Sequence, residues 1–145
     1  MDEYVAPQQL ESAAAGGQTA AAYQLGIMLA DAEPDQARRW LEQAAEGGHP
    51  AAAYQLGILL AAYEPEAARE WLERAARSGQ GVAAFQLGLM LVDTEPDQAR
   101  HWLEQAADGG HVGAAYQLGV MLADSDPDQA RHWLELAARG GASRR

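Results

Sequence analysis

Two histidine–aspartate pairs are the side chains whose type and spacing come nearest to a metal site. His101 and His132 occupy equivalent places 31 residues apart, and Asp97 and Asp128 precede them by one helical turn. Imidazole and carboxylate groups bind metals, but a site needs three or more of them close together, and the sequence holds no compact cluster. We therefore predict exposed histidines, with no metal and no other cofactor.

The sequence offers no nucleophile with a base beside it. It contains no cysteine, and its serines, at positions 12, 78, 125 and 143, stand mostly in expected caps, turns or the C-terminal tail. The carboxylates are spread over helix faces that we expect to be solvated, and no glycine-rich phosphate loop follows a strand. These observations predict a protein that is not an enzyme.

The charge of the chain restricts its partners. It carries 21 acidic and 10 basic residues, a net charge of -11, and every basic residue is arginine. Nucleic acids and anionic membranes both select basic surfaces, so we expect neither as a partner. The four tryptophans could stack on bases, but their spacing favours a core position. No apolar run is long enough to cross a membrane, and the N-terminus lacks a signal-peptide pattern, so we expect a cytoplasmic protein, of bacterial origin from its arginine-only composition.

A repeat of 31 residues runs through the chain. Tryptophan recurs at 40, 71, 102 and 133, proline at 34, 65, 96 and 127, and glycine at 26, 57, 88 and 119. Such self-similarity is typical of solenoids built from stacked supersecondary units. We predict a single repeat domain: an N-terminal half-repeat at 1–17, four repeats at 18–48, 49–79, 80–110 and 111–141, and a tail at 142–145.

Each repeat divides into two helices, here called A and B. In the first repeat, helix A is predicted from Thr19 to Asp31 and helix B from Pro34 to Glu46. Proline suits the first position of a helix, and the Gly-Gly pair at 47–48 supplies a left-handed C-cap. Helices this short are marginal alone, so stacking must stabilise them. His49 and His111 follow such pairs and are predicted at the start of helix A.

The two helices distribute their apolar residues differently. Helix B is amphipathic, with Trp40 and Leu41 on the predicted buried arc and charged residues opposite. Helix A has a broad core arc that includes Leu25, Gly26 and Met28, and we attribute the mid-helix glycine to the close approach of a neighbouring helix. The opposite arc of helix A is also largely apolar or aromatic, so it is either covered or a binding surface.

One set of residues recurs in all four repeats, with phenylalanine for tyrosine in the third, and covers nearly the whole chain. In the first repeat it comprises Ala21, Tyr23, Leu25, Gly26, Leu29, Ala37, Trp40, Leu41, Ala44, Ala45 and Gly48. This pattern resembles the Sel-one-like repeat (SLR), a relative of the tetratricopeptide repeat. The resemblance implies an all-α fold, a right-handed α/α superhelical solenoid, and a non-enzymatic scaffold that binds other proteins in a concave groove lined by the A helices.

In such a groove the second arc of helix A would form four stripes. The aromatic stripe is Tyr23, Tyr54, Phe85 and Tyr116. The aliphatic stripe is Ile27, Ile58, Leu89 and Val120. The amide stripe is Gln24, Gln55, Gln86 and Gln117. An acidic edge follows at Asp31, Asp93 and Asp124.

These stripes could hold an extended or helical peptide of a protein partner, because apolar groups supply contact area and amides can bond a peptide backbone. The acidic edge would favour a basic partner. Alternatively, the aromatic and aliphatic residues pack between successive A helices, and the glutamines cap backbone groups between repeats. The sequence leaves both interpretations open.

The C-terminal repeat suggests a second hypothesis. Leu136 stands where the other repeats have glutamine or arginine, which widens the apolar face of its helix beside Trp133. Terminal repeats of solenoids need a polar outer face. This end could therefore pair with another chain in an end-to-end homodimer, and a structural or self-assembling role, in a natural or an engineered array, is the alternative to a monomeric binding module.

Overall fold

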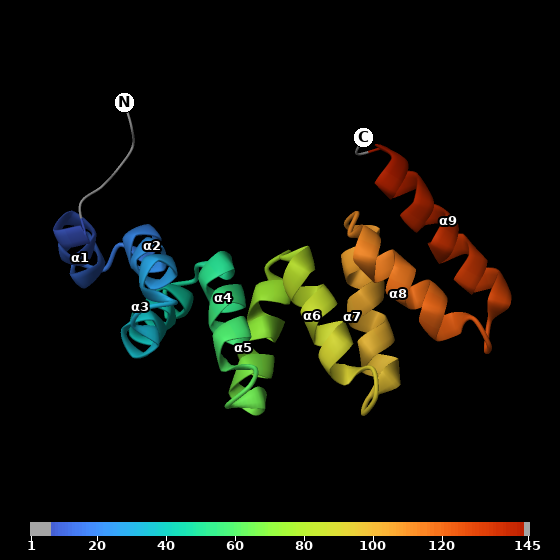
Figure 1. The fold of residues 1–145 in the computed structure, drawn as a ribbon, viewed down its shortest axis with the longest axis horizontal. Helices are drawn as coiled ribbons and strands as arrows, with labels where there is room; N and C mark the ends of the chain where they lie inside the picture. Colours follow the sequence, from blue (N-terminus) through green and yellow to red (C-terminus); the bar gives the residue numbers. More distant parts are fainter. Residues whose placement is uncertain (1–6, 144–145) are drawn as a thin grey trace. The chain divides into compact units, whose positions relative to one another are not determined.

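The computed structural model describes residues 7–143 and, within them, the side chains of residues 8–140. These residues form nine α-helices and no strand (Figure 1). The chain divides into two compact units, residues 1–78 and 79–145. Unit 1 contains α1 (Pro7–Ala15), α2 (Thr19–Leu29), α3 (Pro34–Glu46), α4 (Pro50–Leu60) and α5 (Pro65–Arg77). Unit 2 contains α6 (Gly81–Leu91), α7 (Pro96–Asp108), α8 (Val112–Leu122) and α9 (Pro127–Ser143).

Consecutive helices pack against each other within each unit. In unit 1, α2 pairs with α3 and α4 with α5 as hairpins, and α3 also contacts α4 (Figure 1). In unit 2, α6 pairs with α7 and α8 with α9, and α7 contacts α8. The all-α helical-repeat solenoid expected from the sequence is confirmed, with one A–B hairpin per repeat. The first six and the last two residues of the chain, parts of the predicted half-repeat and tail, lie outside the described residues.

The repeated prolines and Gly-Gly pairs set the helix boundaries. The B helix of each of the four repeats begins at the proline that recurs every 31 residues. In the turn from helix B to helix A, the first residue has an ordinary negative φ and the second has a φ between 95° and 98° at Gly48, Gly79 and Gly110. A side chain is disfavoured at such a φ, which explains why Ser78 can replace the first glycine of the pair but the second stays glycine.

The core consists of alanine and leucine from both helices of each hairpin. Leu25, Leu56, Leu87 and Leu118 of the A helices are almost fully buried, as are Leu41, Leu72 and Leu103 of the B helices. The mid-helix glycine lies directly against the leucine of helix B: a Cβ on Gly57 would come within 2.6 Å of Cγ of Leu72. The expected close approach is thus confirmed, and the group that approaches is a leucine side chain.

Two details of the predicted helices differ from the structure. Helix A of the first repeat ends at Leu29, so Asp31 lies in the turn and not on the helix. Met28, assigned to the core arc, is exposed. In the second repeat its counterpart Leu59 is half-buried and lines a cavity with the N-terminal turn of α3.

The last helix continues past its Gly-Gly pair. Whereas α3 and α7 end just before the pair, α9 runs through residues 140–141 to Ser143. The left-handed turn of the other repeats redirects the chain into the next A helix, and no helix follows α9 in the described residues.

Candidate functional site

The aliphatic stripe of the A helices lies on the surface. Its four side chains are between 36% and 51% exposed, although the leucine two positions earlier in each helix is almost fully buried. Apolar residues at one repeated, exposed position are not needed for the hairpin core, which the buried leucines and alanines already form. The exposed members are Ile27 and Ile58 in unit 1 and Leu89 and Val120 in unit 2.

The aromatic stripe is half-buried, except at Tyr116, which is exposed. In unit 1 the ring of Tyr23 stacks on the imidazole of His49, with 4.6 Å between centroids and 21° between planes. In unit 2 Phe85 stacks on His111 at 4.4 Å and 27°. Each stack joins an A helix to the start of the next one, so the aromatic residues support the packing of neighbouring repeats and still present part of their surface to solvent.

His49 and His111 hold their rings in place by capping helices. Nδ1 of His49 accepts a hydrogen bond of 3.2 Å from the backbone N–H of Ala52, and Nδ1 of His111 accepts one of 3.0 Å from that of Ala114. The sequence predicted both residues at the start of helix A, and the structure shows that they are the N-caps of α4 and α8. The capping bond fixes the orientation of the imidazole. The face of the imidazole ring then stacks on the aromatic ring of the preceding A helix.

The amide and acidic positions lie beside these residues. Gln24 is exposed and its three counterparts are half-buried, and within the part of the chain that the structure describes none of the four amides has a hydrogen-bond partner. In the described residues these glutamines therefore make no hydrogen bond that caps a backbone group of a neighbouring repeat. Asp31, Asp93 and Asp124 are exposed in the turns between helices A and B.

An ion-pair cluster joins α3 of the first repeat to the N-cap of α5 in the second repeat. The guanidinium of Arg38 donates from Nε to Glu42 at 3.0 Å and from Nη1 to Glu64, the N-cap of α5, at 2.6 Å. These bonds raise the pKa of Arg38 and lower the pKa of Glu64. In unit 2 the shorter Asp126 stands in place of Glu64 and instead accepts a capping bond of 3.2 Å from the N–H of Gln129.

The histidines first considered as metal ligands lie on exposed faces of B helices. His101 and His132 each lie edge-on to the neighbouring tryptophan, at 5.5 and 5.3 Å between ring centroids. The described residues contain no group of three or more histidine, cysteine, aspartate or glutamate side chains arranged to hold a metal ion. The tryptophans are half-buried in the first two repeats and buried in the last two, consistent with a core role.

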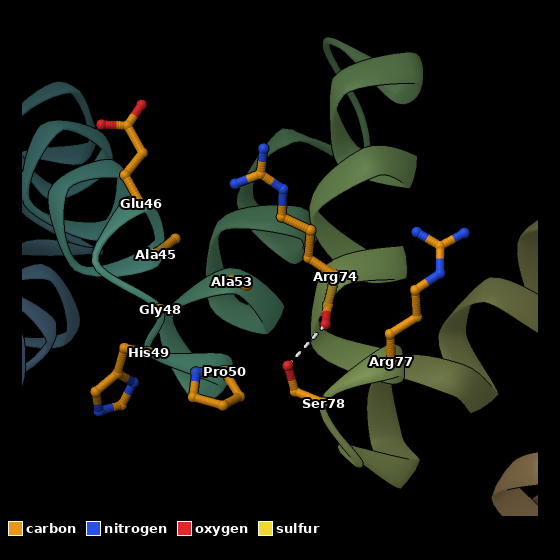
Figure 2. A pocket seen from close by; sticks show the side chains of 9 residues that line it. All are labelled: Ala45, Glu46, Gly48, His49, Pro50, Ala53, Arg74, Arg77 and Ser78. Carbon is orange, nitrogen blue, oxygen red and sulfur yellow. Dashed lines mark hydrogen bonds between the residues drawn. The ribbon is translucent and has the colours of Figure 1, made fainter.

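A cavity of about 320 Å³ lies between the end of α3, the start of α4 and the end of α5 in unit 1 (Figure 2). Two of the ten arginines of the chain line it, and apart from the carboxylate of Glu46 its polar side chains are engaged by neighbouring groups. Nδ1 of His49 caps α4, and Figure 2 shows its ring pointing away from both arginines. The hydroxyl of Ser78 donates to the carbonyl of Arg74 (Figure 2), whose guanidinium covers Trp71, and Arg77 pairs with Glu73. We therefore assign it no ligand.

The end of unit 2 departs from the repeat pattern. Leu134 packs against Gly119 of α8, yet it is 38% exposed, whereas its counterparts in the three preceding B helices are at most 2% exposed; in the described residues no further A helix follows α9. Leu136 is also exposed. Trp133, the other possible dimer contact predicted from the sequence, is buried, so the exposed apolar side chains at this end are Leu134 and Leu136.

Besides Met28 and Val82, sequence reasoning missed two exposed apolar residues, Leu134 and Tyr63. Leu134 could not be recognised, because the equivalent leucine is core in every other repeat. Tyr63 is 83% exposed in the turn between α4 and α5, where the other repeats have Ala32, Thr94 and Ser125. This departure from the repeat was visible in the sequence and could have indicated a surface specific to one repeat.

The fold and the exposed stripes define the class of protein: a helical-repeat solenoid with apolar surface on its A helices. The family follows from comparison. The Sel1 repeat model matches residues 15–49, 50–80, 81–111 and 112–141, and the chain belongs to this family. Sel1 repeat proteins are generally scaffolds for protein–protein interaction and are typically not enzymes. None of the described helices is both long and apolar enough to span a bilayer.

Solved structures agree with this assignment. A protective antigen of uropathogenic Escherichia coli strains that displays an SLR fold is 26% identical, with a TM-score of 0.82 over 91% of this chain and 32% of that one. A Sel1 repeat protein from Oxalobacter formigenes is 28% identical, with a TM-score of 0.77 over 93% of this chain and 45% of that one. The chain thus spans less than half the length of either. MamA, at 19% identity and a TM-score of 0.70 over 95% and 88%, shares the fold. No curated protein matches the chain.

Proposed function

We propose that this protein binds a peptide or helix of a partner protein along the exposed stripes of its A helices. The observation that carries the proposal is the aliphatic position, which is exposed in all four A helices while the hairpin core is complete without it. Exposed apolar groups repeated along a surface are typical of interaction sites. In unit 1 the surface comprises Ile27 and Ile58 with the tyrosines beside them, and in unit 2 Leu89 and Val120 with Phe85 and Tyr116.

The polar residues next to these stripes define the kind of partner. The glutamine amides of the A helices can both donate to and accept from a peptide backbone. The net charge of -11 and the exposed Asp31, Asp93 and Asp124 favour a segment that carries arginine or lysine. An amphipathic helix with a basic back, or an extended basic peptide with alternating apolar residues, fits both features.

The experiment is a fluorescence-anisotropy titration with a labelled basic amphipathic peptide and a scrambled peptide of the same composition. Tyr54→Ala combined with Tyr116→Ala removes one aromatic residue from each unit and should weaken binding of the amphipathic peptide about tenfold or more. Leu136→Gln, which removes an exposed apolar residue away from the A helices, is the matched control and should bind as the wild type does.

The outcome distinguishes surface from core. If the double variant loses its far-UV circular dichroism at 25 °C, the tyrosines are structural and the binding surface must be withdrawn as proposed. If it folds and binds with unchanged affinity, or if the scrambled peptide binds equally well, the stripes do not recognise the peptide.

A second candidate function is self-association through the terminal repeat, which the exposure of Leu134 and Leu136 favours. Two copies meeting at these leucines would cover apolar surface that α9 leaves open. Sedimentation velocity over a range of concentrations should then show a dimer that Leu136→Gln weakens; glutamine already stands at this position in the first and third repeats, so the variant should fold. A monomer at high concentration, unchanged in the variant, excludes this candidate.

A further inference from the structure

A cavity in unit 1 is distinct from the A-helix stripes. It has a volume of about 350 Å³ and lies between the N-terminal turn of α3, the C-terminal end of α4 and the turn into α5. Its walls are largely apolar, with Leu59, Leu60, Pro34 and the ring of Tyr63 around the charged Asp35, Arg38 and Glu64.

Tyr63 has no role in the packing of the repeat. Its side chain is 83% exposed, and the three equivalent positions are filled by alanine, threonine and serine without loss of the hairpin. Its backbone is nonetheless held firmly, because its N–H donates to the carbonyl of Leu60 at 3.0 Å and the next N–H, of Glu64, donates to the same carbonyl at 2.7 Å. A large ring on a fixed turn loses little entropy when a partner covers it.

The same turn has also lost its acidic residue. The other three repeats carry an aspartate one position before the residue equivalent to Tyr63, and this repeat carries Ala62. The two changes together make this turn the most apolar of the four. Because both substitutions occur in one repeat only, this turn has a surface that the other three repeats do not share.

The charged residues that line the cavity determine which charge a bound partner segment should carry. Its single cation, Arg38, forms ion pairs with Glu42 and Glu64. The second pair holds the side chain of Glu64 in place in the cavity wall. With one arginine against the carboxylates of Glu64 and Asp35, the lining carries a net negative charge. Among the described side chains none pairs with Asp35, whose carboxylate is exposed on the first turn of α3.

We propose that this cavity is a second docking surface, which takes a partner segment with a large apolar side chain next to an arginine or lysine. The apolar side chain lies against Tyr63 and Leu59, and the neighbouring cation pairs with Asp35. The surface is separate from the A-helix stripes, so either binding surface can exist without the other.

The test is an NMR titration of the ¹⁵N-labelled full chain with three blocked tetrapeptides, Gly-Leu-Arg-Gly, Gly-Leu-Gln-Gly and Gly-Leu-Glu-Gly. The arginine peptide should shift the amide signals of residues 59–64 and of Asp35. Its dissociation constant should rise about tenfold in Tyr63→Ala, which removes the central contact, and about two- to fivefold in Asp35→Asn, the range for a partly exposed ion pair. Val82→Ala removes an exposed apolar side chain from the other unit, outside the A-helix stripes, and is the control.

Four results would overturn the proposal. The three peptides could bind equally, which would remove the role of charge. No signal could shift at millimolar peptide, or the shifts could fall on α2 and α4 around Ile27 and Ile58, which would support the stripes instead. The signals of residues 59–64 could move with protein concentration alone, which would make a second copy of the chain the occupant. Tyr63→Ala should fold normally, because alanine occupies this position in the first repeat.

Discussion

The contact between the mid-helix glycine and the leucine of helix B gives the sharpest test of the packing. Gly57→Ala adds one methyl group in α4. The new Cβ would lie 2.6 Å from Cγ and 2.7 Å from Cδ2 of Leu72, about 1 Å closer than two carbon atoms normally approach. Leu72 is fully buried, so its side chain has no free space into which it can move.

Two effects of opposite sign determine the result. Alanine is favoured over glycine within a helix by about 1 kcal/mol. Overpacking of a close-packed core costs about 1–3 kcal/mol, and a leucine without room to move places this site at the upper end of that range. We therefore expect Gly57→Ala to lower the free energy of unfolding by about 2 kcal/mol.

A double-mutant cycle identifies the cause. Leu72→Ala alone should cost about 2–5 kcal/mol, because it leaves a cavity. Gly57→Ala combined with Leu72→Ala should cost less than the sum of the two single changes, since the added methyl then fills part of that cavity. The free energies come from urea unfolding monitored by circular dichroism.

The matched control is Gly81→Ala at the start of α6, where a new Cβ would have no atom within 4 Å. This variant should be neutral or stabilised by up to about 1 kcal/mol. If Gly57→Ala were as stable as Gly81→Ala, or if the two changes of the cycle were additive, the leucine contact would not be the reason for glycine in helix A.

Three further perturbations test the turns and the caps. Gly110→Ser, at a φ of 97°, should cost about 1–2 kcal/mol in urea unfolding, whereas Gly109→Ser, at a φ of -83°, should be nearly neutral because the second repeat already has serine there. His111→Ala should cost about 1 kcal/mol from the lost cap of α8, and His111→Asn should recover most of it; equal losses would mean that ring stacking, not capping, stabilises this turn. Glu64→Gln should destabilise the protein at pH 7. Because Arg38 lowers the pKa of Glu64 in the folded state, the stabilisation by the pair is complete above the ordinary value of 4.5 and is lost as the pH falls through the lowered value. The difference in unfolding free energy between wild type and Glu64→Gln should therefore shrink as the pH falls below 4.5, and a difference that stayed constant with falling pH would contradict the ion pair as its source.

Much of the fold could be predicted because the repeat makes each feature visible four times. Proline before helix B, the Gly-Gly pair after it and the period of the apolar residues fix the helices of the first three hairpins to within two residues, whereas α9 continues past its Gly-Gly pair. The same logic assigned His49 and His111 to helix starts, where the structure shows them as caps. These are local effects of backbone geometry, so they depend on the sequence nearby.

The candidate site was predicted less completely, because exposure depends on neighbouring helices. Ile27 and its equivalents lie on the arc that the sequence singled out, and the structure shows them exposed. Tyr23 and Phe85 lie on the same arc, yet each is partly covered by a histidine from the next repeat. A helical wheel cannot distinguish these cases, because the covering residue lies 26 positions further along the chain.

By itself the sequence determined the class of fold, the number of hairpins and the absence of a sequence motif for catalysis, because these follow from period, turn residues and side-chain chemistry. Only the tertiary structure decided which residues at equivalent positions of the repeats are buried and which are exposed. Leu134 is exposed while Leu41, Leu72 and Leu103 are core, and Tyr63 stands beside a cavity whose walls come from two repeats. Burial is a property of what packs against a side chain, and that neighbour is specified elsewhere in the chain.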